Sequence, residues 1–131
     1  MIHERDRQLT AVVQEAAVVE DIESAAIFVV APGTGSLQLV AAAGIEGPAL
    51  DGLVAAVQDP AHPVARALDD DGPTFDVYPL NPGGPRLRSH LPFRNDSGEP
   101  AGVLAVAHDI SLQDPQRRLL ILLAERASRH V

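Results

Sequence analysis

Residues 86–107 read RLRSHLPFRNDSGEPAGVLAVA, and this stretch predicts a pair of antiparallel strands. Residue types alternate over residues 86–94, which is the period of two that a strand shows. Asn95-Asp96-Ser97-Gly98 supplies turn residues, and the apolar run over residues 101–107 has the length of a buried strand. We therefore expect a β-hairpin here.

A second hairpin is predicted nearer the N-terminus. Residues 25–31 are apolar and partly β-branched, and residues 37–43 form another apolar run. The residues between them, PGTG at 32–35, provide a turn. Residues 74–80 predict one further strand, and the Pro- and Gly-rich residues 81–85 that follow predict a loop.

Helical periodicity marks both ends of the chain. Over residues 4–19, apolar side chains recur with the spacing of one helix face. Near the other end, Asp114 as N-cap and Pro115 at the first helical position predict the start of a second helix. The six apolar residues 119–124 cover nearly the whole circumference of that helix.

These elements fit one α+β domain. The chain has 131 residues, of which 46% are hydrophobic, and this is enough for one core. Two short helices are predicted between the hairpins, over residues 50–57 and 63–68. Both terminal helices can pack on the same face of a single antiparallel sheet.

The order and spacing of these segments resemble those of the GAF family of small-molecule sensor domains. The matching segments are the first hairpin (AIFVV at 26–30 and LQLVAAAG at 37–44), the short helix (HPVARAL at 62–68), the last hairpin (SHLPF at 89–93, Gly98 and GVLAV at 102–106) and the final helix (Asp114 and residues 119–124). The resemblance covers residues 5–130 and rests on the whole set of segments.

The resemblance implies an α+β, GAF-like fold, related to the profilin-like and PAS-like folds, with an antiparallel sheet of about six strands. A single domain would span residues 1–131, with terminal helices over residues 1–22 and 114–130 on one face of a sheet core over residues 25–108. The lid segment 44–90 would close a pocket on the other face. Domains of this family bind a cyclic nucleotide, a tetrapyrrole, a haem or a small metabolite, or bind no ligand and act as dimerising connectors.

The composition removes some of these ligands. The chain contains no cysteine, which excludes a thioether-linked tetrapyrrole, a methionine sulfoxide reductase of this fold and a thiolate metal site. All ten basic residues are Arg, and without Lys the signature of the cyclic-nucleotide-binding members cannot be completed. The cofactor is therefore left unknown, with cyclic nucleotides disfavoured.

The other motifs indicate structure rather than chemistry. Gly33-Thr34-Gly35 lacks the third glycine and the strand-to-helix context of a dinucleotide site. His62, His90 and His108 lie too far apart for a local metal motif, although a metal site assembled in three dimensions or an axial haem ligand stays open. Asp69-Asp70-Asp71 lacks the alternating ligands of a calcium loop. With no GxSxG elbow and no activated carboxylate pair, no enzymatic activity is expected.

Candidate ligand-binding residues lie in the lid segment. Strand alternation places Arg86, Arg88, His90 and Arg94 on one side. These residues form either an exposed charged sheet edge that discourages aggregation, or an anion-binding lip to which Arg66 adds a contact. Phe75 and Tyr78 either line the pocket or belong to the core. The predicted ligand-binding residues are thus Arg66, Phe75, Tyr78, Arg88 and His90.

The apolar surface of the terminal helices predicts a homodimer. One sheet cannot bury all of residues 119–124, and two copies could bury the remainder in a four-helix bundle across a two-fold axis. The predicted interface residues are Leu9, Val12, Val13, Ala16, Leu119, Leu120, Leu122 and Leu123.

Charge and composition also bear on partners. The net charge of −8 and the few aromatic residues, three Phe and one Tyr, argue against nucleic acid. No apolar run approaches the ~18 residues of a membrane span, so a cytoplasmic location is expected. We expect a non-enzymatic sensory or regulatory signalling domain with an unknown small-molecule ligand and an output domain such as a kinase or a transcription regulator. The alternative is a ligand-free module for dimerisation or protein interaction.

Overall fold

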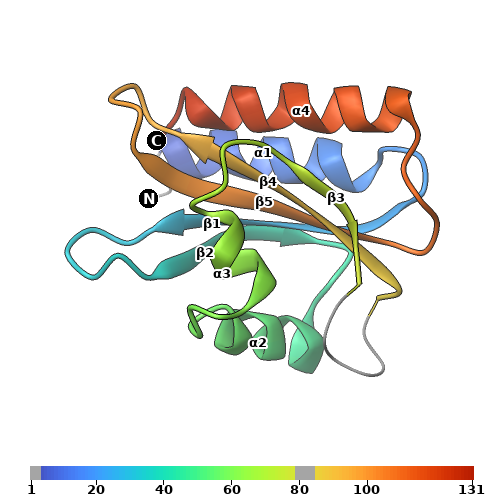
Figure 1. The fold of residues 1–131 in the computed structure, drawn as a ribbon, viewed down its shortest axis with the longest axis horizontal. Helices are drawn as coiled ribbons and strands as arrows, with labels where there is room; N and C mark the ends of the chain where they lie inside the picture. Colours follow the sequence, from blue (N-terminus) through green and yellow to red (C-terminus); the bar gives the residue numbers. More distant parts are fainter. Residues whose placement is uncertain (1–3, 79–84) are drawn as a thin grey trace.

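The computed structural model describes residues 4–78 and 85–131, which form an antiparallel sheet with helices on both faces (Figure 1). The strands within these residues are β1 (Ile22–Val30), β2 (Leu37–Ala43), β3 (Thr74–Val77), β4 (Leu87–Arg94) and β5 (Pro100–His108). The helices are α1 (Glu4–Ala17), α2 (Gly47–Ala56), α3 (Pro63–Ala67) and α4 (Asp114–Ser128). The α+β class expected from the sequence is confirmed.

The strand order in the sheet is β2-β1-β5-β4-β3, and every neighbouring pair is antiparallel. The two predicted hairpins are β1–β2 and β4–β5, and the pairing of β1 with β5 joins them. β1 and β5 are buried over most of their length, because both of their faces are covered. β4 lies between β5 and the edge strand β3, so that its backbone is paired on both sides.

The terminal helices α1 and α4 lie side by side on one face of the sheet (Figure 1). Leu9 of α1 and Leu120 of α4 are fully buried in a core cluster that includes Ile27 of β1. At the surface, Arg126 of α4 forms an ion pair with Glu15 of α1. The predicted placement of both terminal helices on one face is therefore confirmed.

Most of the residues that were predicted for a dimer interface belong to this core instead. The buried residues, each at most 9% exposed, are Leu9, Val12, Val13, Ala16, Leu120 and Leu123. The sheet of the same chain covers the apolar stripe of α1 and one of the two apolar sides of α4. Of the predicted set, Leu119 and Leu122 of α4 stay on the surface, at 51% and 60% exposed.

The helices α2 and α3 lie on the opposite face of the sheet (Figure 1). A second apolar cluster there joins Val57, which follows α2, and Val64 of α3 to Phe28 and Val103 of the sheet. This cluster has fewer buried residues than the one beneath α1 and α4. The hollows of the candidate site lie beside it.

The structure corrects two details of the sequence prediction. The described residues form five strands rather than the about six that the resemblance implies, and these five correspond to the five strand segments read from the sequence. The N-cap of α4 is Gln113 rather than Asp114, and its N–H donates to the Gln116 side chain at 2.7 Å. Residues 79–84, which hold the end of the predicted strand 74–80 and most of the predicted loop 81–85, lie outside the described residues. Within residues 4–78 and 85–131, no helix is long and apolar enough to span a membrane.

Candidate functional site

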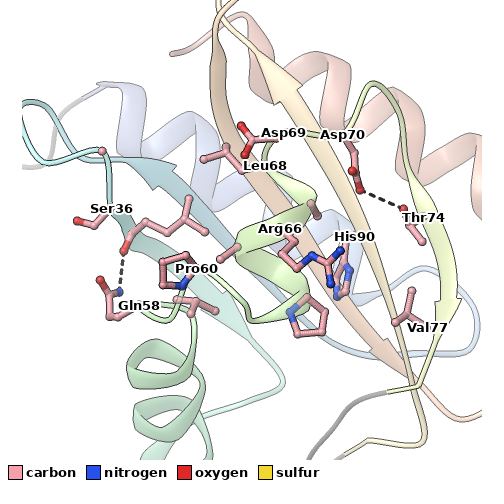
Figure 2. A pocket seen from close by; sticks show the side chains of 16 residues that line it. Ser36, Gln58, Pro60, Arg66, Leu68, Asp69, Asp70, Thr74, Val77 and His90 are labelled. Atoms are coloured by element: carbon pink, nitrogen blue, oxygen red, sulfur yellow. Dashed lines mark hydrogen bonds between the residues drawn. The ribbon is translucent and has the colours of Figure 1, made fainter.

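A cavity of about 750 Å³ lies between the sheet and α3 (Figure 2). Its walls come from the turn before β2, the segment after α2, α3 with the turn that follows it, β3 and β4. The volume falls in the range of small-molecule sites. The polar side chains that line it are Ser36, Gln58, Arg66, Asp69, Asp70, Thr74 and His90.

The short helix α3 is positioned by its own sequence. Pro63 occupies its first turn, and the His62 Nδ1 atom accepts a hydrogen bond from the Val64 N–H at 3.2 Å. Because Nδ1 is the acceptor, the neutral ring carries its proton on Nε2. Val64 and Ala67 are buried against the sheet, while Arg66 lines the cavity.

Hydrogen bonds from two side chains, Gln58 and Thr74, hold the rim of the cavity (Figure 2). The Gln58 Nε2 atom donates to the Leu37 carbonyl oxygen at 2.9 Å and to the Val54 carbonyl oxygen at 3.2 Å, which joins the end of α2 to β2. On the other side, the Thr74 hydroxyl donates to the Asp70 carboxylate at 3.5 Å. The rim is thus tied to the sheet at both ends.

Arg88 and His90 project from the same face of β4, because residues i and i+2 of a strand share a face. His90 lines the cavity, and Arg88 lines a second hollow of about 420 Å³ beside α2. His90 is 2% exposed, and neither its Nε2 nor the Arg88 Nε has a hydrogen-bond partner in the described part of the chain. Buried polar atoms normally have hydrogen-bond partners, so these two unpaired nitrogens mark this face of β4 as a candidate binding site.

The pKa values of the site follow from its burial. Burial, then the positive charge of Arg88 and then that of His62 lower the pKa of His90 to about 4. Burial lowers the pKa of the Arg88 guanidinium. Burial and the charge of Arg88 lower the pKa of His62, and Asp59 opposes this effect. At neutral pH both histidines are therefore neutral, and Arg88 holds the positive charge of the group.

A register shift in β3 brings Thr74 and Val77 to the same cavity. Thr74 pairs with His90 and Val77 with Arg88, so that three steps along β3 match two along β4. Asp76 takes a φ of 60°, in the left-handed region that non-glycine residues seldom adopt. The shift has the character of a β-bulge, which re-aims side chains relative to simple alternation.

On the face of the sheet that α1 and α4 cover, a polar network links β3, β4, β5 and α4. The Ser89 hydroxyl accepts from the Asp76 N–H at 3.1 Å and lies 2.9 Å from the His108 Nε2 atom. The His108 Nδ1 atom lies 2.8 Å from the Ile110 carbonyl oxygen, so Nδ1 is the donor and Nε2 accepts from Ser89. Ser89 and His108 are fully buried, which makes this pair a structural connection rather than a nucleophile and its base.

The Asp76 carboxylate continues this network to the start of α4. Its Oδ1 atom accepts from the Leu112 N–H at 3.1 Å, and its Oδ2 atom accepts from Arg117 Nη2 at 2.9 Å. Asp76, at the bulge in β3, therefore binds both the segment before α4 and the first turns of α4. We refer to Asp76, Ser89, His108 and Arg117 as the β3–α4 network.

The structure places three of the five predicted ligand-binding residues at the hollows: Arg66 and His90 at the cavity, and Arg88 at the second hollow. Phe75 and Tyr78 lie elsewhere. The Phe75 ring packs against the core on the face that α1 and α4 cover, 4.6 Å from the Arg117 guanidinium carbon, because it follows Thr74, which faces the cavity, and adjacent strand residues point to opposite faces. Tyr78 is 71% exposed and lines a separate surface hollow.

The outer two of the four alternating cations are on the surface. Arg86 is exposed, and Arg94 donates to the Gly98 carbonyl oxygen at 2.8 Å and pairs with Asp71. The sequence interpretation as an exposed sheet edge is therefore wrong for the inner two, because β4 is not an edge strand, His90 is buried and Arg88 is half-buried. Among the described residues, no three His, Asp or Glu side chains gather as a metal site.

Two contributions to the site were missed at the sequence level. His62 was considered as a metal ligand, and its role as the N-cap of α3 was not foreseen, although a polar residue before Pro at a helix start is a known signal. Thr74 and Val77 reach the cavity through the register shift, which no pattern of period two predicts.

No protein-family model and no curated protein sequence matches the chain. Solved structures do match. A GAF domain from a phosphoenolpyruvate-protein phosphotransferase of Coxiella burnetii superposes with a TM-score of 0.75 at 13% identity, covering 97% of this chain and 82% of that one. The second GAF domain of DevS from Mycobacterium smegmatis gives 0.72 at 18% identity, covering 95% and 91%.

The chain has the fold of a GAF domain. A third structure, residues 122 to 287 of a methyl-accepting chemotaxis protein, gives a TM-score of 0.71 at 23% identity and covers 95% of this chain and 87% of that one. These superpositions extend over almost the entire chain, so the GAF fold includes both terminal helices and the segment with α2 and α3.

Proposed function

We propose that this chain is a sensory or regulatory signalling domain that binds a small molecule between its sheet and the helices α2 and α3. The observation that supports this best is the 750 Å³ cavity, since His90 on its wall is 2% exposed and keeps an unpaired ring nitrogen. A bound molecule would supply the partner that the folded chain lacks. Proteins of similar fold include a GAF domain of a putative sensor histidine kinase from Pseudomonas syringae and part of a chemotaxis protein.

The β3–α4 network supports a regulatory role. Thr74 and Val77 of β3 line the cavity, and Asp76 between them holds Arg117 and the Leu112 N–H at the start of α4. A ligand that moves β3 therefore changes contacts at the N-terminal end of α4. In a longer protein, this helix would pass the change to an output domain such as a kinase or a transcription regulator.

Dimerisation through the terminal helices is the second part of the proposal. Leu119 and Leu122 are exposed large apolar side chains on α4, three positions apart and therefore adjacent on the helix surface. A second copy that packs α4 against α4 would remove them from water. The alternative function, a ligand-free dimerisation module, is favoured by the same two residues and needs no cavity.

Native mass spectrometry of the freshly purified chain, combined with a thermal-shift screen of metabolites, tests ligand binding. We expect either a bound small molecule in the mass spectrum or a compound that raises the melting temperature. The thermal shift should disappear when the cavity is filled by Ala65→Trp and persist in Gln38→Trp on the exposed edge of β2. A chain with an empty mass spectrum and no stabilising compound would favour the ligand-free alternative.

A further inference from the structure

We propose that the group on the ligand recognised by β4 is an anion, a carboxylate or a phosphate, and that Arg88 and His90 bind it. The inference rests on the proposed function, because it names the chemical class of the molecule that enters the hollows. It goes beyond the presence of a cavity, since a cavity of this volume can equally hold a neutral compound.

The first argument is the state of the two side chains. Arg88 Nε and His90 Nε2 are both buried and both lack a hydrogen-bond partner in the described part of the chain. A guanidinium offers only donors, and its fork matches the two oxygens of a carboxylate or phosphate. A neutral His90 with a proton on one nitrogen adds a further donor, and protonation of the ring would add a charge.

The second argument is the absence of an internal counter-ion. The acidic side chains that line the two hollows are Glu23, Asp69, Asp70 and Asp109. In the part of the chain that the structure describes, none of them forms an ion pair with Arg88 or His90. Arg88 is half-buried and its Nε atom is fully buried, so leaving this donor without a partner is unfavourable, and an anion from outside would supply the partner.

The third argument is the placement of a further cation, Arg66. Its side chain lines the cavity from α3. Figure 2 shows Arg66 on the helix wall and His90 on the sheet wall of the same cavity. Hydrogen-bond donors therefore come from both walls, the charged Arg66 from α3 and the neutral His90 ring from β4, so that an anion held at β4 also meets α3.

Isothermal titration at constant ionic strength tests the proposal. The probes are inorganic phosphate, succinate and its uncharged diamide, succinamide. Phosphate, succinate or both should bind the wild-type chain, and succinamide should not. Arg88→Gln should weaken binding at least about 30-fold, as expected when one partner of a buried charged hydrogen bond is removed. Arg86→Gln removes the same charge from an exposed position two residues away and should bind like wild type.

NMR of the histidine side chains locates the bound anion. Phosphate or succinate should shift the imidazole signals of His90, and this shift should disappear in Arg88→Gln. Should Arg88→Gln fail to fold, Arg88→Met keeps the apolar stem and serves in its place. Arg88→Met should also raise the melting temperature of the ligand-free protein, because it removes a buried donor that has no partner.

Three outcomes would overturn the anion site. These are equal anion affinity of Arg88→Gln and wild type, no His90 shift at tens of millimolar of either anion, and a neutral compound in the native mass spectrum. The neutral compound would leave the proposed ligand-binding function intact and reject only the anion. An empty mass spectrum together with no binding of any screened compound would reject both.

Discussion

Gly102 of β5 lies where three strands meet. A Cβ atom at this position would collide with the Phe28 carbonyl oxygen on β1 and with the Phe93 ring on β4. We expect Gly102→Ala to lower the free energy of unfolding by about 1–3 kcal/mol, the usual effect of overpacking a core. Urea denaturation provides the measurement.

Gly52 is the matched control for this substitution. It lies inside α2, and a Cβ atom there would meet nothing within 4 Å. Gly52→Ala should therefore stabilise the chain by about 0.5–1 kcal/mol through helix propensity. The close approach of β5 to its neighbours would be rejected if both substitutions changed stability in the same direction.

His90 makes the stability of the fold depend on pH. Its pKa is about 4 in the folded chain, whereas an unfolded histidine titrates near its ordinary value of about 6.5. Between these values the unfolded state binds more protons, so the free energy of unfolding falls as the pH falls. The loss from His90 reaches about 2 kcal/mol at pH 5.

Denaturation curves at pH 7.5 and pH 5 check this dependence. His90→Gln should show a smaller loss of stability between the two pH values than wild type, with the residual slope partly due to His62, whose pKa is lowered too. His130→Gln, near the end of the chain after α4, controls for the loss of a histidine as such. An unchanged slope in His90→Gln would contradict the burial of a neutral ring.

At the scale of the elements, α4 has two apolar sides with different roles. Leu120 is fully buried against the sheet, while Leu122 is 60% exposed. Leu120→Ala should therefore destabilise the fold by about 2–5 kcal/mol through the cavity it leaves. Leu122→Arg should leave stability nearly unchanged and convert a dimer into a monomer, which sedimentation velocity at high concentration measures.

Gln38→Arg is the control for this prediction, because it adds the same charge to an exposed position on β2. This variant should sediment like wild type. A wild-type chain that stays monomeric at high concentration would reject the dimer, and the exposure of Leu119 and Leu122 would then need another explanation.

Much of the element pattern could be predicted from the sequence. Both hairpins and both terminal helices follow from local periodicity and turn residues, and β2 has the predicted bounds 37–43. β3 could not be fully predicted, because its register depends on the positive φ of Asp76, and that residue is held by partners on β4 and α4. The same bulge explains why Val77 lines the cavity together with Thr74, whereas Phe75 packs in the core beneath Arg117, the second of its two predicted places.

At the scale of the whole molecule, the candidate site was predictable only in part. Alternation along β4 identifies Arg88 and His90 as neighbours on one face, but the burial of His90 and the partial burial of Arg88 depend on β3 and on helices far away in sequence. The dimer residues show the same limitation. An apolar stripe on a helix indicates that another surface covers it. Only the folded structure shows that, for Leu9 and Leu120, this surface is the sheet of the same chain.

The contrast between a negative exterior and an inward-facing Arg88 has a kinetic consequence. With a net charge of −8, the molecule repels a small anion at long range, although the guanidinium attracts it at contact. Salt screens the distant repulsion over about 8–10 Å at ordinary ionic strength. Added electrolyte should thus speed the entry of the anion, the opposite of the behaviour of receptors whose basic surfaces guide anions inward.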